Sequence, residues 1–384
     1  MYSKGLCVIL SLCLIIPSTS FAQATWEKTF GGTDWDIGYF IEKTPDQCYI
    51  IGGETRSFGS GGDFYVLKIN ETGDILWERH FGKEGYEYGK AIITTLDGNF
   101  VIIGDIDYGE ENTVEDAYII KIDTSGNLLW EKTFGGKGCE QVFSVQQTSD
   151  NGCIICGGTT SFSEDFNIYI LKLDKDGEVI WERSFGTEEE EMGMSVLSLT
   201  NDNFLVLAYR GPEESRDIYL LKLDRDGNIL WEKVIDIDIG VTPLSIDEAS
   251  DGGYVISGYK GVLLEDNCLF VAKTDNDGNL IWSTVFGGSI GCSIKETTDK
   301  NYIVVGRIYS SEENGEDVYL VKLDTSGNLI WEKTYGGSNN DGGASLQLTL
   351  DGGYIIVGQT LSFGKGESDL YVLKVDSEGN LLEK

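Results

Sequence analysis

Histidine is almost absent from this sequence, and so is any sustained helical periodicity. His80 is the only histidine among 384 residues. This scarcity excludes multi-histidine zinc sites and imidazole-based catalytic triads. No segment keeps an apolar period of about 3.6 residues. Short runs of Val, Ile, Leu and Tyr bounded by Gly, Asp and Asn recur instead, and they predict an all-β protein.

Basic residues are scarce as well. The chain has 29 Lys and Arg against 64 Asp and Glu, and removal of a leader carrying Lys4 leaves a formal charge of −36. Nucleic acids and anionic membrane surfaces both require clusters of Lys and Arg. We therefore expect no nucleic-acid partner.

Long apolar runs are missing except near the start of the chain. Residues 6–16 are apolar, Lys4 precedes them, and Ser20-Phe21-Ala22 has the small-x-small pattern of a cleavage site. The run is too short to span a bilayer. The pattern predicts a signal peptide over residues 1–22 and a mature domain over residues 23–384. That domain would be secreted, periplasmic or held at the cell surface, with no transmembrane segment after cleavage.

The chain does contain a repeat of about fifty residues. Its clearest copy is GNLIWEKTYGG at 327–337, and its tryptophans are spaced by 51, 53, 51, 50, 51 and 49 residues. They are Trp26, Trp77, Trp130, Trp181, Trp231, Trp282 and Trp331. Such a period is typical of repeat architectures.

Each period predicts four short strands, here called a to d. In the second period they are 90–95, 100–104, 118–122 and 128–134, joined at a to b and c to d by tight Asp, Gly and Asn turns. Seven such units predict a seven-bladed β-propeller of four-stranded antiparallel blades in one domain. The frame starts with a lone strand d at Trp26 and ends without its tryptophan at Glu383. We therefore expect the N-terminal strand to join strand c at 371–375 and close the last blade.

Strand d carries the repeated tryptophan, which we expect to pack between neighbouring blades. Strand c carries a repeated lysine, which we expect to pair across the hairpin with the glutamate that follows most of the tryptophans. These lysines are Lys68, Lys121, Lys172, Lys222, Lys273, Lys322 and Lys374. Six cysteines remain in the mature chain, and none recurs at one place in every repeat. We interpret them as packing residues and leave their disulfide pairing open.

The run K-L-D-x-x-G-N-x-x-W-E resembles the tryptophan-docking repeat of pyrroloquinoline-quinone propeller proteins, with the same Gly227 to Trp231 spacing and a shorter Asp224 to Gly227 interval. This resemblance implies the architecture and no cofactor. The whole period over residues 25–384 resembles exported bacterial and archaeal seven-repeat propellers, some of which carry bulb-type lectin or endoglucanase labels. The lectin motif matches only around Asp226-Gly227-Asn228. Asp224 and Glu232 depart from its ends.

In a propeller the loops d to a and b to c emerge on one face, and here they are long, variable and acidic. We call this the variable face, and the opposite one, formed by the tight turns, the turn face. Trp35, the one tryptophan outside the frame, lies on the variable face between two aspartates, a combination that suits sugars. The candidate ligand residues are Asp34, Trp35, Asp36, Tyr86, Tyr88, Asp105, Asp107 and Tyr108.

Two functions fit this pattern. The first is an exported binding module, expected to be a monomer, that holds a glycan, a peptide or a Ca²⁺-bridged partner on the variable face. The second is a carboxylate-dependent glycoside hydrolase or lyase, which would require two carboxylates to converge in a pocket with raised pKa values. No catalytic constellation and no cofactor is predicted, although the carboxylates suit Ca²⁺. His80 stands where Thr29, Thr133 and Ser184 stand in other repeats, so we interpret it as a spectator.

Overall fold

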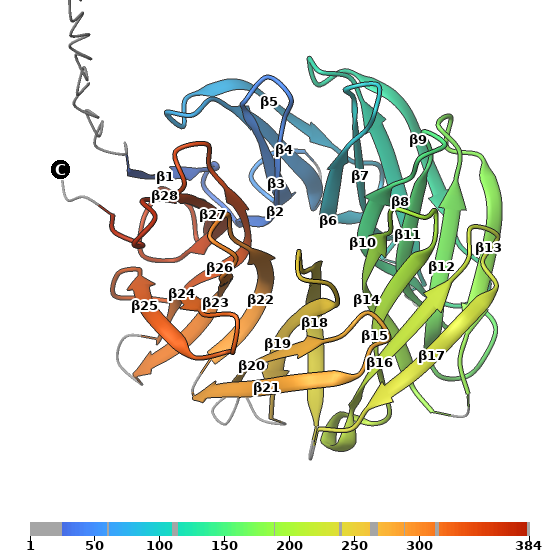
Figure 1. Cartoon of the computed structure of the whole chain (residues 1–384). Coiled ribbons are helices and arrows are strands. Elements are labelled where there is room, and N and C mark those ends of the chain that lie inside the picture. The colour runs from blue at the N-terminus through green and yellow to red at the C-terminus, as the bar shows by residue number, and fades with distance from the viewer. Residues whose placement is uncertain are drawn as a thin grey trace, which may run out of the picture.

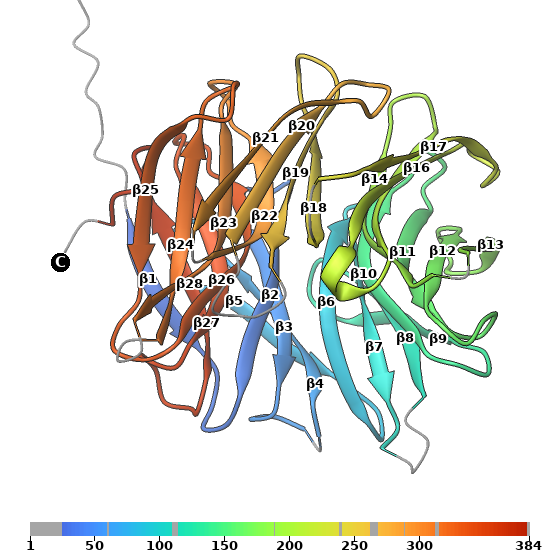
Figure 2. The ribbon, with the colours of Figure 1, turned by 90° about the horizontal axis from the view of Figure 1, so that it is seen from below.

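The protein is a ring of seven four-stranded antiparallel sheets (Figure 1). The computed structural model describes residues 25–381 except 60, 110–113, 188, 238–239, 262–267, 288 and 312–314. The signal peptide predicted at 1–22 lies outside the described residues, as do parts of the acidic loop runs at 110–111, 188 and 312–313. Figure 2 shows the strands running between the two faces of the ring.

Each blade has the order a, b, c, d from the centre outward, and all seven innermost strands surround the axis (Figure 1). Strands a are β2 (Asp36–Lys43), β6 (Tyr86–Thr94), β10 (Glu140–Gln147), β14 (Glu191–Ser198), β18 (Val241–Glu248), β22 (Ser289–Glu296) and β26 (Asp341–Leu348). Strands b are β3 (Tyr49–Thr55), β7 (Phe100–Asp107), β11 (Cys153–Thr159), β15 (Phe204–Arg210), β19 (Tyr254–Lys260), β23 (Tyr302–Ser311) and β27 (Tyr354–Thr360).

In six blades the outer half is a c–d hairpin, and in the seventh the N-terminal strand β1 supplies strand d. Strands c are β4 (Asp63–Ile69), β8 (Glu115–Ile122), β12 (Asn167–Leu173), β16 (Asp217–Leu223), β20 (Cys268–Thr274), β24 (Gly315–Leu323) and β28 (Asp369–Val375). Strands d are β5 (Ile75–Phe81), β9 (Leu128–Phe134), β13 (Val179–Phe185), β17 (Ile229–Ile235), β21 (Leu280–Gly287), β25 (Leu329–Tyr335) and β1 (Trp26–Phe30). One short 3₁₀ helix, η1 (Glu213–Ser215), lies in a b–c loop.

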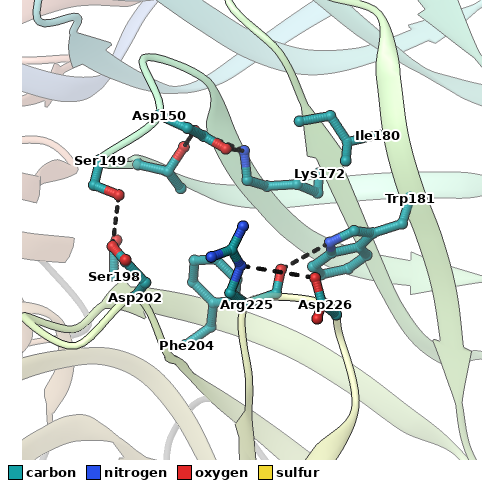
Figure 3. A pocket seen from close by; sticks show the side chains of 11 residues that line it. Ser149, Asp150, Lys172, Ile180, Trp181, Ser198, Asp202, Phe204, Arg225 and Asp226 are labelled. Carbon is teal, nitrogen blue, oxygen red and sulfur yellow. Dashed lines mark hydrogen bonds and ion pairs between the residues drawn. The ribbon is translucent and has the colours of Figure 1, made fainter.

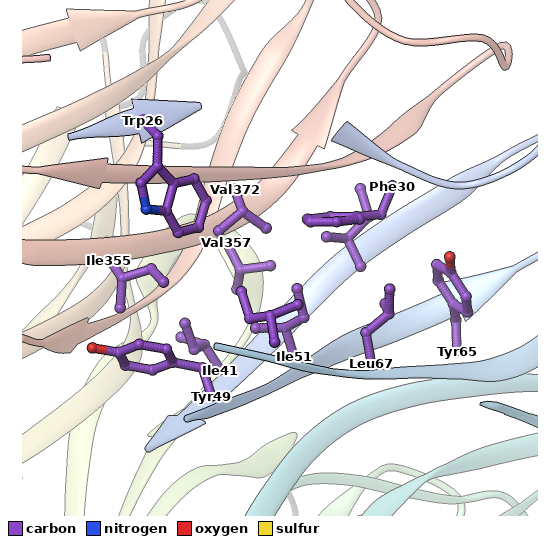
Figure 4. Packing of buried hydrophobic residues seen from close by; sticks show 12 residues of the cluster. Trp26, Phe30, Ile41, Tyr49, Ile51, Tyr65, Leu67, Ile355, Val357 and Val372 are labelled. Atoms are coloured by element: carbon purple, nitrogen blue, oxygen red, sulfur yellow. The ribbon is translucent and has the colours of Figure 1, made fainter. Parts of the chain in front are cut away.

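The N-terminal strand closes the ring, as the repeat frame predicted. β1 pairs antiparallel with β28, and Trp26 lies opposite Lys374. Figure 4 shows Trp26 and Phe30 above a layer of apolar side chains that comes from both the last and the first blade, including Ile51 and Val357. Closure therefore joins the first and last blades of the repeat array through one shared core.

Each repeated tryptophan docks onto the c–d turn of the next blade. The indole N–H of Trp26 donates to the carbonyl of Glu71 at 3.1 Å, and that of Trp181 donates to Arg225 at 3.1 Å. The ring lies against the turn glycine: a Cβ on Gly73 would come within 2.8 Å of Trp26, and Gly73 has a φ of 74°. Glycine is needed there for both reasons. The predicted packing of the tryptophans between blades is confirmed.

The predicted pairing between the strand c lysines and the strand d glutamates is wrong. Lys68 lies directly opposite Trp77 in the register, so the next residue, Glu78, points to the other face of the sheet. Six of the lysines bind instead to an aspartate of the a–b turn, at 2.7 to 3.1 Å: Lys68–Asp46, Lys121–Asp97, Lys172–Asp150, Lys273–Asp251, Lys322–Asp299 and Lys374–Asp351.

The glutamates accept hydrogen bonds from strand c tyrosines on the opposite face of the sheet. The pairs are Tyr65–Glu78, Tyr118–Glu131, Tyr169–Glu182, Tyr219–Glu232, Tyr319–Glu332 and Tyr371–Glu27. The last pair includes the closing strand β1, so that blade keeps the same pattern. Both sets of contacts repeat around the ring, which identifies them as parts of the structural frame.

Candidate ligand site in the central channel

Every innermost strand contains a β-bulge, and the extra residue of each bulge lines the central channel. In β6 the pairing passes from Gly89 to Ala91 and leaves Lys90 unpaired. The sequence predicted a strand beginning at Lys90, whereas the observed strand starts at Tyr86 and continues through the bulge. A bulge turns the side chain of its unpaired residue away from the regular alternation of the strand.

The seven bulge residues occupy one repeat position and are all different. They are Tyr39, Lys90, Phe143, Met194, Leu244, Cys292 and Ala344. The residues that flank them are much more uniform, with glycine before the bulge in five blades and serine after it in five. Because the residue at the bulge differs in every blade, packing of the blades does not require one particular side chain there. All seven bulge residues face the central channel.

That space is a cavity of about 520 Å³ bordered by all seven bulge residues. Glu54, Tyr88, Asp105, Glu115, Gln141 and Arg307 complete its wall. Glu115 is the first residue of β8, and Glu54 is the penultimate residue of β3, so both lie near loops of the variable face. The cavity therefore occupies the half of the channel nearer that face. Its volume falls in the range of roughly 300–1,000 Å³ that is usual for small-molecule sites.

Asp105 is held rigidly in the cavity wall. Its carboxylate accepts hydrogen bonds from the ammonium of Lys90 and, at 2.8 Å, from the backbone N–H of Val142 in the next blade. Burial raises the pKa of Asp105 to about 6, while the charge of Lys90 opposes that rise. Lys90 in turn lies 4.3 Å from the ring centre of Phe143. These contacts tie the second and third blades together at the cavity.

Arg307 is the second cation of the cavity wall. Its Nη1 lies 3.4 Å from Glu316, and its buried Nε has no hydrogen-bond acceptor among the described residues. Glu54 is buried nearby and lies 3.8 Å from Arg56. Burial raises the pKa of Glu54 and of Tyr39, and the charge of Glu54 adds to the rise for Tyr39. The wall thus combines aromatic, aliphatic and charged groups.

The structure places the predicted ligand residues in two separate groups. Tyr88 and Asp105 line the cavity, and they lie opposite each other on β6 and β7. Tyr86 pairs with Asp107 two residues further toward the variable face, and Tyr86 and Tyr108 are both exposed. These residues form the edge of the second blade beside the cavity.

Asp34, Trp35 and Asp36 lie instead where the last blade meets the first. Trp35 forms a bridge with Ser368, and its indole N–H donates to Glu367 at 2.7 Å. Asp36 is fully buried, and its carboxylate accepts hydrogen bonds from Thr55, from Ser57 at 2.6 Å and from its own loop. Asp36 therefore holds its loop in place, while half-buried Trp35 keeps part of its ring accessible.

Another cavity, of about 290 Å³, lies between the third and fourth blades on the turn face (Figure 3). Its polar groups bind one another: Lys172 pairs with Asp150 at 2.9 Å, and Ser149 donates to Asp202 at 2.5 Å. A similar cavity of about 260 Å³ lies between the sixth and seventh blades and contains Lys322. Because these cavities recur with the tryptophan-docking frame, we attribute them to blade packing.

Other chemistry is limited among the described residues. No group of three or more His, Cys, Asp or Glu is arranged there to hold a metal ion. The part of the chain that the structure describes also contains no helix with the length and hydropathy of a membrane span. His80 lies 3.4 Å from Asp63 through Nδ1 and 6.0 Å from the ring of Phe58. His80 thus takes part in a local surface contact of the first blade.

Sequence reasoning missed most of the cavity wall. The candidate residues came from the variable loops, whereas the bulge residues lie inside strands that look regular in the sequence. Aligning the seven periods on the glycine that precedes the bulge in five of them would have shown one position with seven different residues. Only the closed ring shows that the seven positions face the same space.

Comparisons with known proteins agree with this architecture. A family model described as outer membrane protein assembly factor BamB matches residues 62–236, which is less than half of the chain. No curated protein is similar in sequence to this chain.

Solved structures with very low sequence identity share the fold. The Pan2 WD40 domain of Neurospora crassa has a TM-score of 0.53 at 10% identity, over 94% of this chain and 98% of that domain. Sqt1 from Chaetomium thermophilum has a TM-score of 0.50 at 13% identity, over 87% and 83%. BBS1N, solved in complex with ARL6DN, has a TM-score of 0.54 at 9% identity, over 93% and 97%. The chain is therefore a seven-bladed β-propeller that is similar, over its first blades, to the BamB-type repeat.

Proposed function

We propose that this protein is an exported binding module that takes its ligand on the variable face, centred on the mouth of the central channel. The observation that carries the proposal is the ring of seven different bulge residues around one cavity. A purely structural ring has no need to vary the single position that faces the channel in every blade. Aromatic and charged groups in a concave wall are also typical of binding sites.

Export is supported by the leader pattern at residues 1–22 and by the match to a model described as an outer membrane assembly factor. The formal charge of −36 on the mature chain favours a partner that is not a polyanion. A glycan, a peptide segment or a Ca²⁺-bridged protein surface all remain within this proposal. The module would act in the periplasm, at the cell surface or outside the cell.

Glycan and peptide arrays probed with the mature chain test this function. Two variants, one in the cavity wall and one on the outer surface of a blade, show whether binding depends on the cavity. Tyr88→Ala removes an aromatic wall of the cavity, and we expect about tenfold weaker binding because aromatic residues dominate most binding sites. Leu230→Ala, on the exposed edge of β17, is the matched control and should bind as the wild type does. Binding that survives Tyr88→Ala and is lost in Leu230→Ala would place the site on the outer edge and contradict the proposal.

A second function, a carboxylate-dependent glycoside hydrolase or lyase, is favoured by one observation. Glu54, Asp105 and Glu115 line the same cavity, and burial raises the pKa values of the first two. Against this function, Asp105 is only 1% exposed and both of its oxygens already accept hydrogen bonds. Hydrolysis of a glycan that binds in the arrays, abolished by Glu54→Gln with binding retained, would establish the enzyme in place of the binding module.

A further inference from the structure

The seven bulge residues of the central cavity divide into an apolar arc and a polar arc. The bulge residues of the third to seventh blades are all apolar or nearly so, and they follow one another around the ring: Phe143, Met194, Leu244, Cys292 and Ala344. The first and second blades contribute Tyr39, Tyr88 and Lys90 to the other side. A ligand that fills this space must therefore present an apolar side to the bulge residues of these five blades, and Arg307 of the sixth blade is the charged group on that side.

The acids of the cavity are occupied by groups of the protein itself. Asp105 accepts from Lys90 and Val142, and Glu115 accepts a hydrogen bond from Gln141. The side chain of Glu54 is only 5% exposed and lies beside Arg56. An incoming cation would have to break these contacts before it reached any of the three carboxylates.

Arg307 is the charged group that a ligand can reach. Its side chain is 35% exposed, compared with 1% for that of Asp105, and its one ion pair, with Glu316, is long at 3.4 Å. Its guanidinium lies against Gly342 of the last blade, where a Cβ would stand 3.7 Å from Nε. Gly342 contributes no side chain that would compete with a ligand for the guanidinium. An arginine with unused donors binds carboxylates well because its fork matches their geometry.

We infer that the central cavity binds an amphipathic carboxylate, with the carboxylate on Arg307 and the apolar body against Phe143, Met194 and Leu244. This inference rests on the proposed function and names the ligand class for it. Two sources supply such a group: a free medium-chain organic acid, and the C-terminal residue of a peptide that ends in leucine or phenylalanine. A glycan fits this cavity less well, because hydroxyl groups facing the apolar arc would lose their hydrogen bonds to water.

Isothermal titration calorimetry with the mature chain tests the inference, first by changing the ligand and then by changing the protein. The probes are octanoate and a short acetylated peptide ending in leucine, each compared with its neutral carboxamide. We expect the carboxylate forms to bind about 10- to 100-fold more tightly than the amides, as a charged hydrogen bond to arginine predicts. Whichever of the two acids binds more tightly identifies the source of the ligand.

Variants then assign the contact to residues. Arg307→Gln should remove the preference for carboxylate over amide, Arg307→Lys should retain part of it, and Leu244→Asn should weaken both forms. Arg216→Gln is the control, since Arg216 pairs with Glu190 and stacks on Tyr209 away from the cavity wall. Circular dichroism and melting curves establish that each variant is folded. The amide comparison uses wild-type protein, so it decides the question even if Arg307→Gln does not fold.

The possible outcomes separate this inference from the proposed function. Equal binding of acids and amides, or a carboxylate preference that persists in Arg307→Gln, overturns the inference. Binding of a glycan at the variable face with no measurable binding of either acid also overturns it and leaves the proposed function intact. If neither the arrays nor the acids reveal a ligand that depends on Tyr88, both are wrong.

Discussion

Replacing Trp26 by alanine is expected to lower the free energy of unfolding by about 3 to 5 kcal/mol, the usual cost of removing a buried tryptophan. Trp26 is 9% exposed, packs in the core shared by the last and first blades, and donates a hydrogen bond to Glu71. It also belongs to β1, the only strand d that no hairpin turn connects to its partner among the described blades. Guanidinium chloride unfolding followed by circular dichroism measures the loss.

Two other tryptophans supply the controls for this experiment. Trp181→Ala removes an equally buried ring inside the array and should cost a similar amount. Trp35→Ala removes a half-buried ring whose indole donates to exposed Glu367, so a loss below about 1.5 kcal/mol is expected for that hydrogen bond. If Trp35→Ala destabilises the protein as much as Trp26→Ala, Trp35 is a plug of the blade junction and not a candidate ligand residue. If Trp26→Ala changes nothing, closure by β1 does not stabilise the ring.

Replacing Glu87 by glutamine is expected to stabilise the protein at pH 8 by up to about 3 kcal/mol and to change little at pH 4.5. Glu87 is fully buried, and Asp63 lies close by. The Oε1 of Glu87 accepts a hydrogen bond from the N–H of Lys83 at 2.9 Å, whereas its Oε2 has no hydrogen-bond partner among the described residues. Burial raises the pKa of Glu87 from 4.5 to about 7, and the charge of Asp63 adds to the rise. The folded state therefore holds this proton more tightly than the unfolded state does.

The sign of the pH effect follows from that difference. Between pH 4.5 and 7 the folded protein binds more protons than the unfolded chain at this site, so the wild type loses stability as the pH rises through this window. Glutamine carries no charge and removes the loss. Urea unfolding at a series of pH values measures it, and a gain that is the same at pH 4.5 and pH 8 would contradict the assignment.

Glu140→Gln is the matched control, because Glu140 stands at the same place in the third blade with different neighbours. Its carboxylate accepts a hydrogen bond from the N–H of Gly136 at 2.7 Å, as that of Glu87 does from Lys83, and a second one from the hydroxyl of Thr159 at 2.6 Å. In the second blade Ile106 occupies the place of Thr159, opposite Glu87 in the register, and supplies no hydroxyl. We therefore expect Glu140→Gln to destabilise the protein at pH 8, where Glu87→Gln stabilises it.

The fold could be predicted from the sequence because each blade repeats the same local rules. The spacing of the tryptophans set the length of a blade, the Asp, Gly and Asn turns set its hairpins, and the mismatch between Trp26 at one end and Glu383 at the other predicted how the ring closes. Each of these signals is local or repeats at a fixed interval, so it remains visible without coordinates. Ring closure by β1 on β28 confirmed the least local of them.

The side-chain partners and the candidate site were decided by the tertiary structure. Lys68 pairs with Asp46 and not with Glu78, because the register across β4 and β5 places lysine and glutamate on opposite faces. Register depends on the position of every residue in the hairpin, and the one-residue irregularity beside Lys68 is not visible in the sequence. The repeats by themselves determined a ring of seven four-stranded antiparallel blades. Only closure of that ring brought Lys90, Phe143 and Arg307 from three blades to one cavity, because residues so far apart in the chain meet through the packing of whole blades.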